Sequence, residues 1–319
     1  MSAIAAPKMD KPSMLFVGVT TGGSFINRLF PRWADILGLE TRQLAGMDIP
    51  VNSEPGVYRQ VARFLRQEAN ALGALVTTHK VNLFESASDL FDRFDSYARR
   101  LGEVSSISKQ QGLLVGHAKD PITSGKALER VVKPTYWEEH SGAEALILGS
   151  GGSALALTCY FLERPAGRRP AKIHLTGRTP ARLDHLKEVL SEIPGHDRVE
   201  VHHTTDPQQH KTLLEALPER SLVANATGMG KDRPGSPLPD SARFPRHAIA
   251  WEFNYRGTLE FLHQARSQRE ERSLLVEDGW IYFLYGWSYV IAEVFHFDLT
   301  DELFDGLERK ANEIRSSKA

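Results

Sequence analysis

The chain has 319 residues, of which 41% are hydrophobic and 25% charged, a composition typical of a soluble globular protein. The 39 Lys and Arg residues balance 40 Asp and Glu residues to a net charge of −1, which argues against nucleic acid or an anionic membrane as a partner. The single Cys159 excludes an internal disulfide and a Cys-x-x-Cys site, so we expect the protein to be located in the reducing cytoplasm. The histidines form no His-Glu-x-x-His motif, so we expect no metal site. Neither a secretory signal nor a membrane span is expected.

The N-terminal part of the chain alternates apolar runs with stretches of helical spacing. The expected elements are a strand at 14–19, a helix at 25–37, a strand at 44–51, a helix at 56–72 and a strand at 74–77. Such alternation predicts an α/β fold with a mostly parallel sheet, whose ligand sites lie beyond the carboxyl ends of the strands. Ser24 and Lys80 both follow such ends.

A polar segment at 126–139 is expected to lead from one domain to the next. The sharpest motif comes directly after it, where an apolar strand at 145–148 runs into Gly149-Ser150-Gly151-Gly152-Ser153-Ala154 and a helix. This matches G-x-G-x-x-A in its strand-turn-helix context, with Gly149 for the tight turn and Gly151 for close approach to a pyrophosphate. Gly152, Ser153 and Ala154 open the helix whose N–H groups would face the anion. The motif predicts nucleotide binding; a structural glycine turn is the alternative.

Two further strands define the remaining edges of the predicted nucleotide site. The strand at 172–175 is followed by Arg178 and Thr179, with no acidic residue to accept from a ribose hydroxyl. This favours NADP over NAD, because an arginine can bind the 2′-phosphate; a solvated arginine is the alternative. The strand at 221–225 runs into a small-residue turn, in which Ala226, Thr227 and Met229 would line the nicotinamide side or form a plain loop.

The end of the chain is apolar at helical spacing. After a strand expected at 248–253, Leu284, Trp287, Ile291 and Val294 form a stripe on the last expected helix. Such a stripe indicates packing against a domain. Gly279, just before this helix, would bring backbone close to a cofactor ring.

The order of the motifs resembles the shikimate dehydrogenase family from Phe16 to about Phe295. Leu75-Val76-Thr77-Thr78-His79-Lys80 is similar to the family's Asn-Val-Thr-Ile-Pro-His-Lys, Gly102-Glu103-Val104-Ser105-Ser106 to its Gly-Ala-Val-Asn-Thr, and Gly116-His117-Ala118-Lys119-Asp120 to its Gly-x-Asn-Thr-Asp. Gly149 to Ala154 is similar to its Gly-Ala-Gly-Gly-Ala-Ala, and Gly177-Arg178-Thr179 to its Asn-Arg-Thr. Asp278-Gly279 also fits the family pattern.

The resemblance implies a reversible NADP-dependent oxidation of a ring hydroxyl. It also implies a two-domain α/β fold: an N-terminal substrate and catalytic domain at 14–130, a doubly wound Rossmann NADP-binding domain at 131–270, and C-terminal helices at 271–319 that return to the first domain. The matched motifs make Lys80 and Asp120 the catalytic candidates. They make Ser24, Thr77, Ser105 and Tyr255 the candidate substrate contacts.

Several departures from the family pattern fall on substrate contacts. Ile26 stands where the family's Ser-x-Ser has its second serine, and Ser105 and Ala118 replace two asparagines. The tyrosine of Tyr-Asn-Pro is Phe253, although Tyr255 lies nearby, and the family glutamine near the C-terminus falls at Gly286. A site built to hydrogen-bond hydroxyls discriminates strongly among substrates. We therefore expect a divergent paralogue that acts on a small polyhydroxylated acid or cyclitol.

Hydride transfer requires a group that takes the hydroxyl proton, and we expect Lys80 in that role with Asp120 as its orienting partner. A lysine ordinarily keeps its proton at neutral pH, so desolvation and the positive nicotinamide ring must favour the neutral amine. A buried ion pair between domain segments is the alternative. The competing functions are a true shikimate or quinate dehydrogenase, a non-catalytic nucleotide-binding regulatory protein and a methylenetetrahydrofolate dehydrogenase. We expect a monomer or homodimer.

Overall fold

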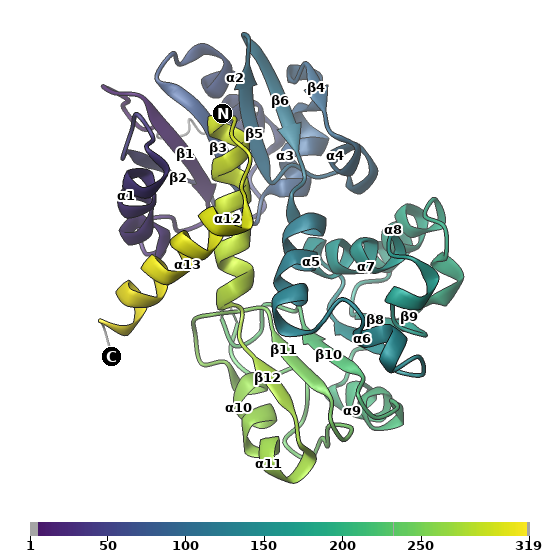
Figure 1. The fold of residues 1–319 in the computed structure, drawn as a ribbon. Helices are drawn as coiled ribbons and strands as arrows, with labels where there is room; N and C mark the ends of the chain where they lie inside the picture. Colours follow the sequence, from purple (N-terminus) through teal and green to yellow (C-terminus); the bar gives the residue numbers. More distant parts are fainter. Residues whose placement is uncertain (1–5, 232, 318–319) are drawn as a thin grey trace. The chain divides into compact units, whose positions relative to one another are not determined.

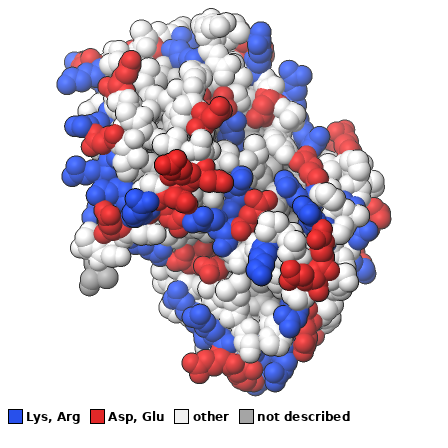
Figure 2. Space-filling view, viewed as in Figure 1, with Lys and Arg blue, Asp and Glu red and all other residues white. Residues whose placement is uncertain are grey.

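The structure is a computed structural model that describes residues 6–231 and 233–317. Its contacts divide the chain into two compact units, one formed by Met1–Lys119 with Leu284–Ala319 and the other by Asp120–Phe283 (Figure 1). Within the described ranges, no helix is long and apolar enough to cross a membrane. Figure 2 shows acidic and basic side chains interspersed over the visible face, consistent with the balanced composition.

The first unit is built on a mixed six-stranded sheet. Its strands lie in the order β2 (Leu44–Asp48), β1 (Ser13–Gly18), β3 (Ala71–Val76), β5 (Ser106–Gln110), β6 (Leu113–His117) and β4 (Arg93–Phe94). The strands β2, β1 and β3 are parallel, whereas β5 runs antiparallel to both β3 and β6. Every residue of β1 is buried, as expected of a central strand covered on both faces.

Helices supply the apolar cover of this sheet. This unit contains α1 (Ile26–Leu37), α2 (Pro55–Gln67), α3 (Lys80–Ala87), α4 (Ser96–Leu101), α13 (Asp301–Ser316) and the part of α12 (Trp280–Phe295) from Leu284 onward, with a 3-10 turn at Ser88–Leu90. On one face, Tyr58 and Val61 of α2 share a buried cluster with Leu15 of β1. On the other face, the Phe16 ring meets Trp287 edge-on at 4.8 Å between centroids. Alternate residues of β1 thus enter opposite layers.

The second unit carries a parallel six-stranded sheet. Its order is β12 (Leu275–Glu277), β11 (Ile249–Glu252), β10 (Leu222–Asn225), β7 (Ala145–Leu148), β8 (Ile173–Gly177) and β9 (Val199–His203). This is the doubly wound order of dinucleotide-binding folds, in which the sequence of strands reverses between β7 and β10. Ligands bind such sheets at this reversal, beyond the carboxyl ends of the strands.

Most of the helices of the second unit lie between its strands in sequence (Figure 1). They are α5 (Asp120–Val131), α6 (Tyr136–Glu139), α7 (Gly152–Leu162), α8 (Pro180–Ser191), α9 (Pro207–Ala216), α10 (Glu260–Ser267) and α11 (Arg269–Arg272), with 3-10 turns at Ala166–Arg168 and His196–Arg198; α12 (Trp280–Phe295) follows β12. Nine of the eleven residues of α7, from Ala154 to Leu162, are buried. Helix α5 packs against α7 at Gly125, where an added Cβ would lie 2.1 Å from the Tyr160 ring.

The structure corrects four of the expected elements. Helix α2 ends at Gln67 instead of 72, since the residues from Ala71 onward pair with β1. The second strand stops at Asp48. The polar segment at 126–139 is largely helical, belonging to α5 and α6, because its apolar positions such as Leu128 and Trp137 are buried. Finally, the apolar stripe of α12 is followed by another helix, α13, whose Thr300 side chain caps its first turn.

Candidate active site

Lys80 is the first residue of α3 and follows directly on a tight turn after β3. Thr77 N donates to Val17 O at 2.9 Å, and Thr78 adopts φ 63°, a left-handed conformation that is uncommon for a β-branched residue. The turn is one residue shorter than the family's lysine motif, and this conformation closes it. The strained turn sets the start of the helix that carries Lys80.

His79, the neighbour of Lys80, serves the fold and not proton transfer. Its Nε2 lies 2.9 Å from Ile49 O and its Nδ1 lies 3.4 Å from the Tyr58 hydroxyl. Burial lowers the pKa of His79, so the ring is held neutral in the core.

The loop that carries Ser24 is fixed by Asp48 at the end of β2. The Asp48 carboxylate accepts from Thr21 N at 2.7 Å and from Thr21 Oγ1 at 2.6 Å. Ser24 is half-buried, but Ile26 is fully buried as the first residue of α1. The second serine of the family's carboxylate-binding pair is therefore replaced by a core residue that presents no donor.

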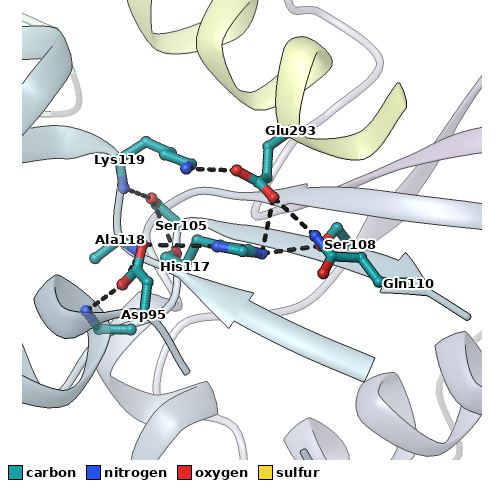
Figure 3. Close-up of polar contacts among 9 residues, drawn as sticks. Asp95, Ser105, Ser108, Gln110, His117, Ala118, Lys119 and Glu293 are labelled. Carbon is teal, nitrogen blue, oxygen red and sulfur yellow. Dashed lines mark hydrogen bonds and ion pairs between the residues drawn. The ribbon is translucent and has the colours of Figure 1, made fainter. Parts of the chain in front are cut away.

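A polar network holds the segment that ends at Lys119 (Figure 3). Ser105 Oγ accepts from Lys119 N at 2.8 Å, and the Lys119 ammonium lies 2.6 Å from Glu293 Oε2 on α12. The side chains of Lys119 and Glu293 are 14% and 20% exposed, which makes this an ion pair largely shielded from water. Ser105, expected as a substrate contact, thus binds the backbone beside Asp120.

His117 joins the same network from the end of β6 (Figure 3). Its Nε2 lies 3.2 Å from Glu293 Oε1 and 2.9 Å from Ser108 Oγ, and its Nδ1 lies 3.6 Å from Asp95. Hydrogen bonds from Ala98 N at 2.7 Å and Ala118 N at 3.3 Å complete the surroundings of the Asp95 carboxylate. Glu293 consequently ties α12 to the residues on either side of Ala118.

Asp120 begins α5 and is 9% exposed. A carboxylate in the first turn is stabilised by the amide dipoles of its helix. Lys80 lies in the first unit and Asp120 opens the second, so their pairing stays a prediction.

The glycine motif connects β7 to α7 in a turn that admits no side chain at its first position. Gly149 has φ 127°, and an added Cβ would lie 2.7 Å from Ala226 O. Gly151 is the N-cap of α7, and its surroundings are open within 4 Å of an added Cβ. The first helical residues, Gly152 and Ser153, therefore present N–H groups at a helix start that has no side-chain cap. This geometry fits a pyrophosphate.

The next candidate residues follow the neighbouring strand β8. Arg178 is exposed, and Thr179 is the N-cap of α8. Gly177, where the family has asparagine, is buried against Ser150, since an added Cβ would lie 2.6 Å from Ser150 Oγ. Gly177, the last residue of β8, therefore leaves room for the serine of the glycine motif. Arg178 follows it directly as the cation expected to meet a 2′-phosphate.

The turn after β10 is organised by a buried carboxylate. Glu252 is fully buried; it accepts from Asn225 Nδ2 at 2.6 Å, and from Asn254 N at 2.8 Å and Nδ2 at 2.6 Å. Asn225 Oδ1 in turn accepts from Thr227 N and Oγ1 at 3.2 and 2.6 Å. Burial raises the pKa of Glu252 to about 7 against the opposing effect of these hydrogen bonds.

The same network reaches the other expected residues on the nicotinamide side. Asn254 Nδ2 donates to Met229 O at 3.3 Å, and Gly279 N donates to Asn254 O at 3.0 Å. Gly279 touches the backbone of Phe253, whose oxygen would lie 2.0 Å from an added Cβ. Tyr255 packs on Phe283, with 4.3 Å between ring centroids. Ala226, Thr227, Met229 and Gly279 therefore border one hydrogen-bonded assembly.

Sequence reasoning missed the two acidic residues that organise these networks. Glu252 ends an otherwise apolar strand, and Glu293 interrupts the apolar helix α12. A charge inside an apolar element is itself a signal, because an acidic side chain there needs partners. Their partners lie far away in sequence and were not evident from the pattern.

Comparisons with known proteins give related enzymes, although no family model matches the chain. The chain is 29% identical over 178 residues to a shikimate dehydrogenase (NADP(+)) of Lactococcus lactis, a stretch that covers 56% of this chain and 59% of that protein. It is also 29% identical over 236 residues to the shikimate dehydrogenase (NADP(+)) of Thermus thermophilus, covering 73% of this chain and 74% of the relative.

The fold agrees with solved structures over nearly the whole chain. The crystal structure of a shikimate 5-dehydrogenase from Listeria monocytogenes in complex with shikimate and NAD has a TM-score of 0.69 and 18% identity, covering 94% of this chain and 96% of that one. The expected α/β fold with a doubly wound parallel sheet is confirmed.

Proposed function

We propose that the chain, which is similar to shikimate dehydrogenases, is an NADP(H)-dependent dehydrogenase that reversibly oxidises a secondary ring hydroxyl of a small polyhydroxylated acid or cyclitol. The observation that carries the proposal is the turn from β7 into α7. Gly149 lies tightly against Ala226 with a positive φ, and the helix start that follows has no side-chain cap, so its N–H groups can bind an anion. The turn lies at the point where the strand order reverses.

The residues of the second unit fit the cofactor. The amides at the start of α7 would bind the pyrophosphate, and the Arg178 guanidinium would bind the 2′-phosphate together with the Thr179 hydroxyl. Ala226, Thr227, Met229 and Gly279 would border the nicotinamide, held in place through Glu252. When bound, the oxidised nicotinamide supplies the acceptor for a hydride from the substrate carbon.

Lys80 would take the proton of the substrate hydroxyl at its Nζ, and Asp120 would orient the amine. The role of Lys80 is supported by its position at the start of α3, which β3 and the strained turn at Thr78 fix. On the side of Asp120, the Lys119–Glu293 ion pair and the Ser105 hydroxyl restrain the adjoining residue. Holding catalytic groups in a fixed geometry accounts for a large part of the rate acceleration that they give.

The substrate differs from shikimate in this proposal. Ile26 is in the core, and the family's asparagine is replaced at Ser105 by a hydroxyl that accepts from Lys119 N, so two family contacts are changed. Ser24, Thr77, Ser105 and Tyr255 stay the candidate substrate contacts. The alternatives are a true shikimate or quinate dehydrogenase, which these four residues would have to support, and a non-catalytic nucleotide-binding regulator.

A substrate panel distinguishes these functions. NADP⁺ and NAD⁺ are each offered shikimate, quinate, other cyclitols and sugar acids, and absorbance at the reduced-nicotinamide band is followed. We expect turnover of a polyhydroxylated compound other than shikimate with NADP⁺. Efficient turnover of shikimate or quinate would establish the first alternative, and NADPH binding without any oxidation would support the second.

Cofactor preference is tested at Arg178. The Arg178→Ala variant should lose NADPH affinity by at least about tenfold while NADH affinity stays the same, because one charge-assisted phosphate contact is worth about 1.5–3 kcal/mol. Arg182→Ala on the exposed face of α8 is the matched control. An unchanged ratio of NADPH to NADH affinity in Arg178→Ala would refute the assignment.

Two observations support our proposals for the cellular location and the partners of the enzyme. The only cysteine of the sequence, Cys159, is buried, which suits a reducing cytoplasm. The interspersed surface charges suit a small-molecule substrate and a monomer or homodimer, without nucleic acid or membrane as a partner.

A further inference from the structure

Two neighbouring strands of the second unit bring two histidines and a glutamate together, away from the glycine turn. His174 lies on β8, and Glu200 and His202 lie on β9, which is the edge strand of the sheet. The register pairs His174 with Glu200, and the alternation of side chains places His202 on the same face as Glu200. We propose that these three residues bind a structural Zn²⁺ ion that clips β9 to β8.

The donor atoms have nearly the spacing of a tetrahedral zinc site. His174 Nδ1 lies 3.1 Å from His202 Nε2 and 3.5 Å from Glu200 Oε2, and His202 Nε2 lies 3.9 Å from the same oxygen. Two ligands at about 2.05 Å from zinc, separated by the tetrahedral angle, are about 3.3 Å apart. The three atoms therefore need to move by only a few tenths of an ångström to share one ion, with water as the fourth ligand.

Outer residues orient the ligands as they do around zinc. His174 Nε2 lies 3.0 Å from Glu144 Oε2, so Nδ1 is the nitrogen left to coordinate. Lys172 Nζ contacts Glu200 Oε1 at 2.6 Å, which leaves Oε2 directed at the histidines. A carboxylate that accepts from the far nitrogen of a ligating histidine is a recurring feature of zinc sites.

The charge and exposure of the cluster also suit a divalent cation. Glu144 and Glu200 contribute two negative charges and Lys172 one positive charge. The side chains of His202 and Glu200 are 27% and 44% exposed, which leaves an entry path. Imidazole and carboxylate ligands together favour zinc over calcium or magnesium.

Without a metal, the two facing imidazole nitrogens share one hydrogen at 3.1 Å, because each nitrogen is otherwise an acceptor aimed at the other. Zinc binding would require His202 to carry that hydrogen on Nδ1 instead of Nε2, so that Nε2 coordinates and the imidazole stays neutral. No electron or further reactant is involved. The ion would tie an edge strand that has only one neighbour in the sheet, which is where a clip adds most order.

The test uses the full chain stripped with EDTA and then titrated with ZnCl₂ by calorimetry. We expect saturation at one equivalent, and Co²⁺ in place of Zn²⁺ should give the visible absorption bands of a tetrahedral site. His202→Gln and Glu200→Gln should each weaken binding at least tenfold, and Glu144→Gln should weaken it about tenfold through its effect on His174. His185→Gln, an exposed histidine on α8, is the matched control and should leave the affinity unchanged.

Two results would overturn the proposal. One is the absence of a saturable one-equivalent site in the wild-type chain. The other is an affinity that stays within twofold of wild type in both His202→Gln and Glu200→Gln, which would place the zinc elsewhere. Because both ligands are partly exposed, these variants should fold, and circular dichroism verifies this before titration. The readout does not depend on dehydrogenase activity.

Discussion

Substituting alanine at the two leading glycines of the cofactor turn separates the role of the turn in folding from its role in binding. At Gly149 the backbone has φ 127°, which costs a residue with a Cβ about 1–3 kcal/mol. The added Cβ would also lie 2.7 Å from Ala226 O and 2.9 Å from its carbon, so the β10 turn must shift. We expect Gly149→Ala to lower the unfolding free energy by about 3 kcal/mol. At Gly151 an added Cβ meets open space, so Gly151→Ala should cost less than about 1 kcal/mol.

Binding is expected to respond differently. Gly151→Ala should fold normally yet raise the NADPH Kd at least about tenfold, because its methyl group would occupy the space of the pyrophosphate. Urea unfolding and NADPH fluorescence titration measure the two effects, and Gly142→Ala, whose added Cβ also meets open space, is the control. If Gly151→Ala bound NADPH within threefold of wild type, the placement of the pyrophosphate on α7 would be refuted.

Two further predictions concern Glu252 and Glu293, the acidic residues that organise the two polar networks. Glu252 has a raised pKa of about 7, so between about pH 4.5 and 7 the folded chain binds more protons than the unfolded chain, and stability falls as pH rises. The loss is about 3 kcal/mol, and melting temperatures across this range should fall less steeply in Glu252→Gln; equal slopes would contradict the burial argument. Glu293→Gln removes the charge facing Lys119 and should lower kcat about tenfold while NADPH affinity is kept, whereas Glu302→Gln on the exposed face of α13 should change neither. An unchanged kcat in Glu293→Gln would show that restraint of Lys119 does not matter for turnover.

The sequence predicted correctly those elements that are determined by residues close together along the chain. The glycine motif at 149–154 combines an apolar strand, a turn and a helix start within ten residues, and the structure forms β7, the turn and α7 there. Helix α1 likewise follows its periodic apolar residues. The end of α2 was misplaced because Leu72 continues the apolar spacing of that helix, yet pairing with β1 draws this stretch into β3.

The contacts that the sequence did not predict join residues that are far apart along the chain. Glu293 meets Lys119 across 174 positions, and Glu252 meets Asn225 across 27. The proposed zinc ligands His174 and His202 are 28 positions apart and match no sequence motif, since the register of β8 with β9 brings them together. The hydrogen bond that the Ser105 hydroxyl accepts from Lys119 N was likewise not evident from the motif, and its contact with substrate stays a prediction.

The most direct test of the proposed mechanism compares wild type with Lys80→Ala on the best substrate of the panel, with NADPH affinity measured in parallel. A positioned acid–base group contributes about 10²- to 10⁴-fold to the rate. We predict that Lys80→Ala lowers kcat by at least about 10²-fold while its NADPH Kd stays within twofold of wild type. Turnover that persists near the wild-type rate in this variant would contradict the assignment of Lys80 as the proton-transferring residue.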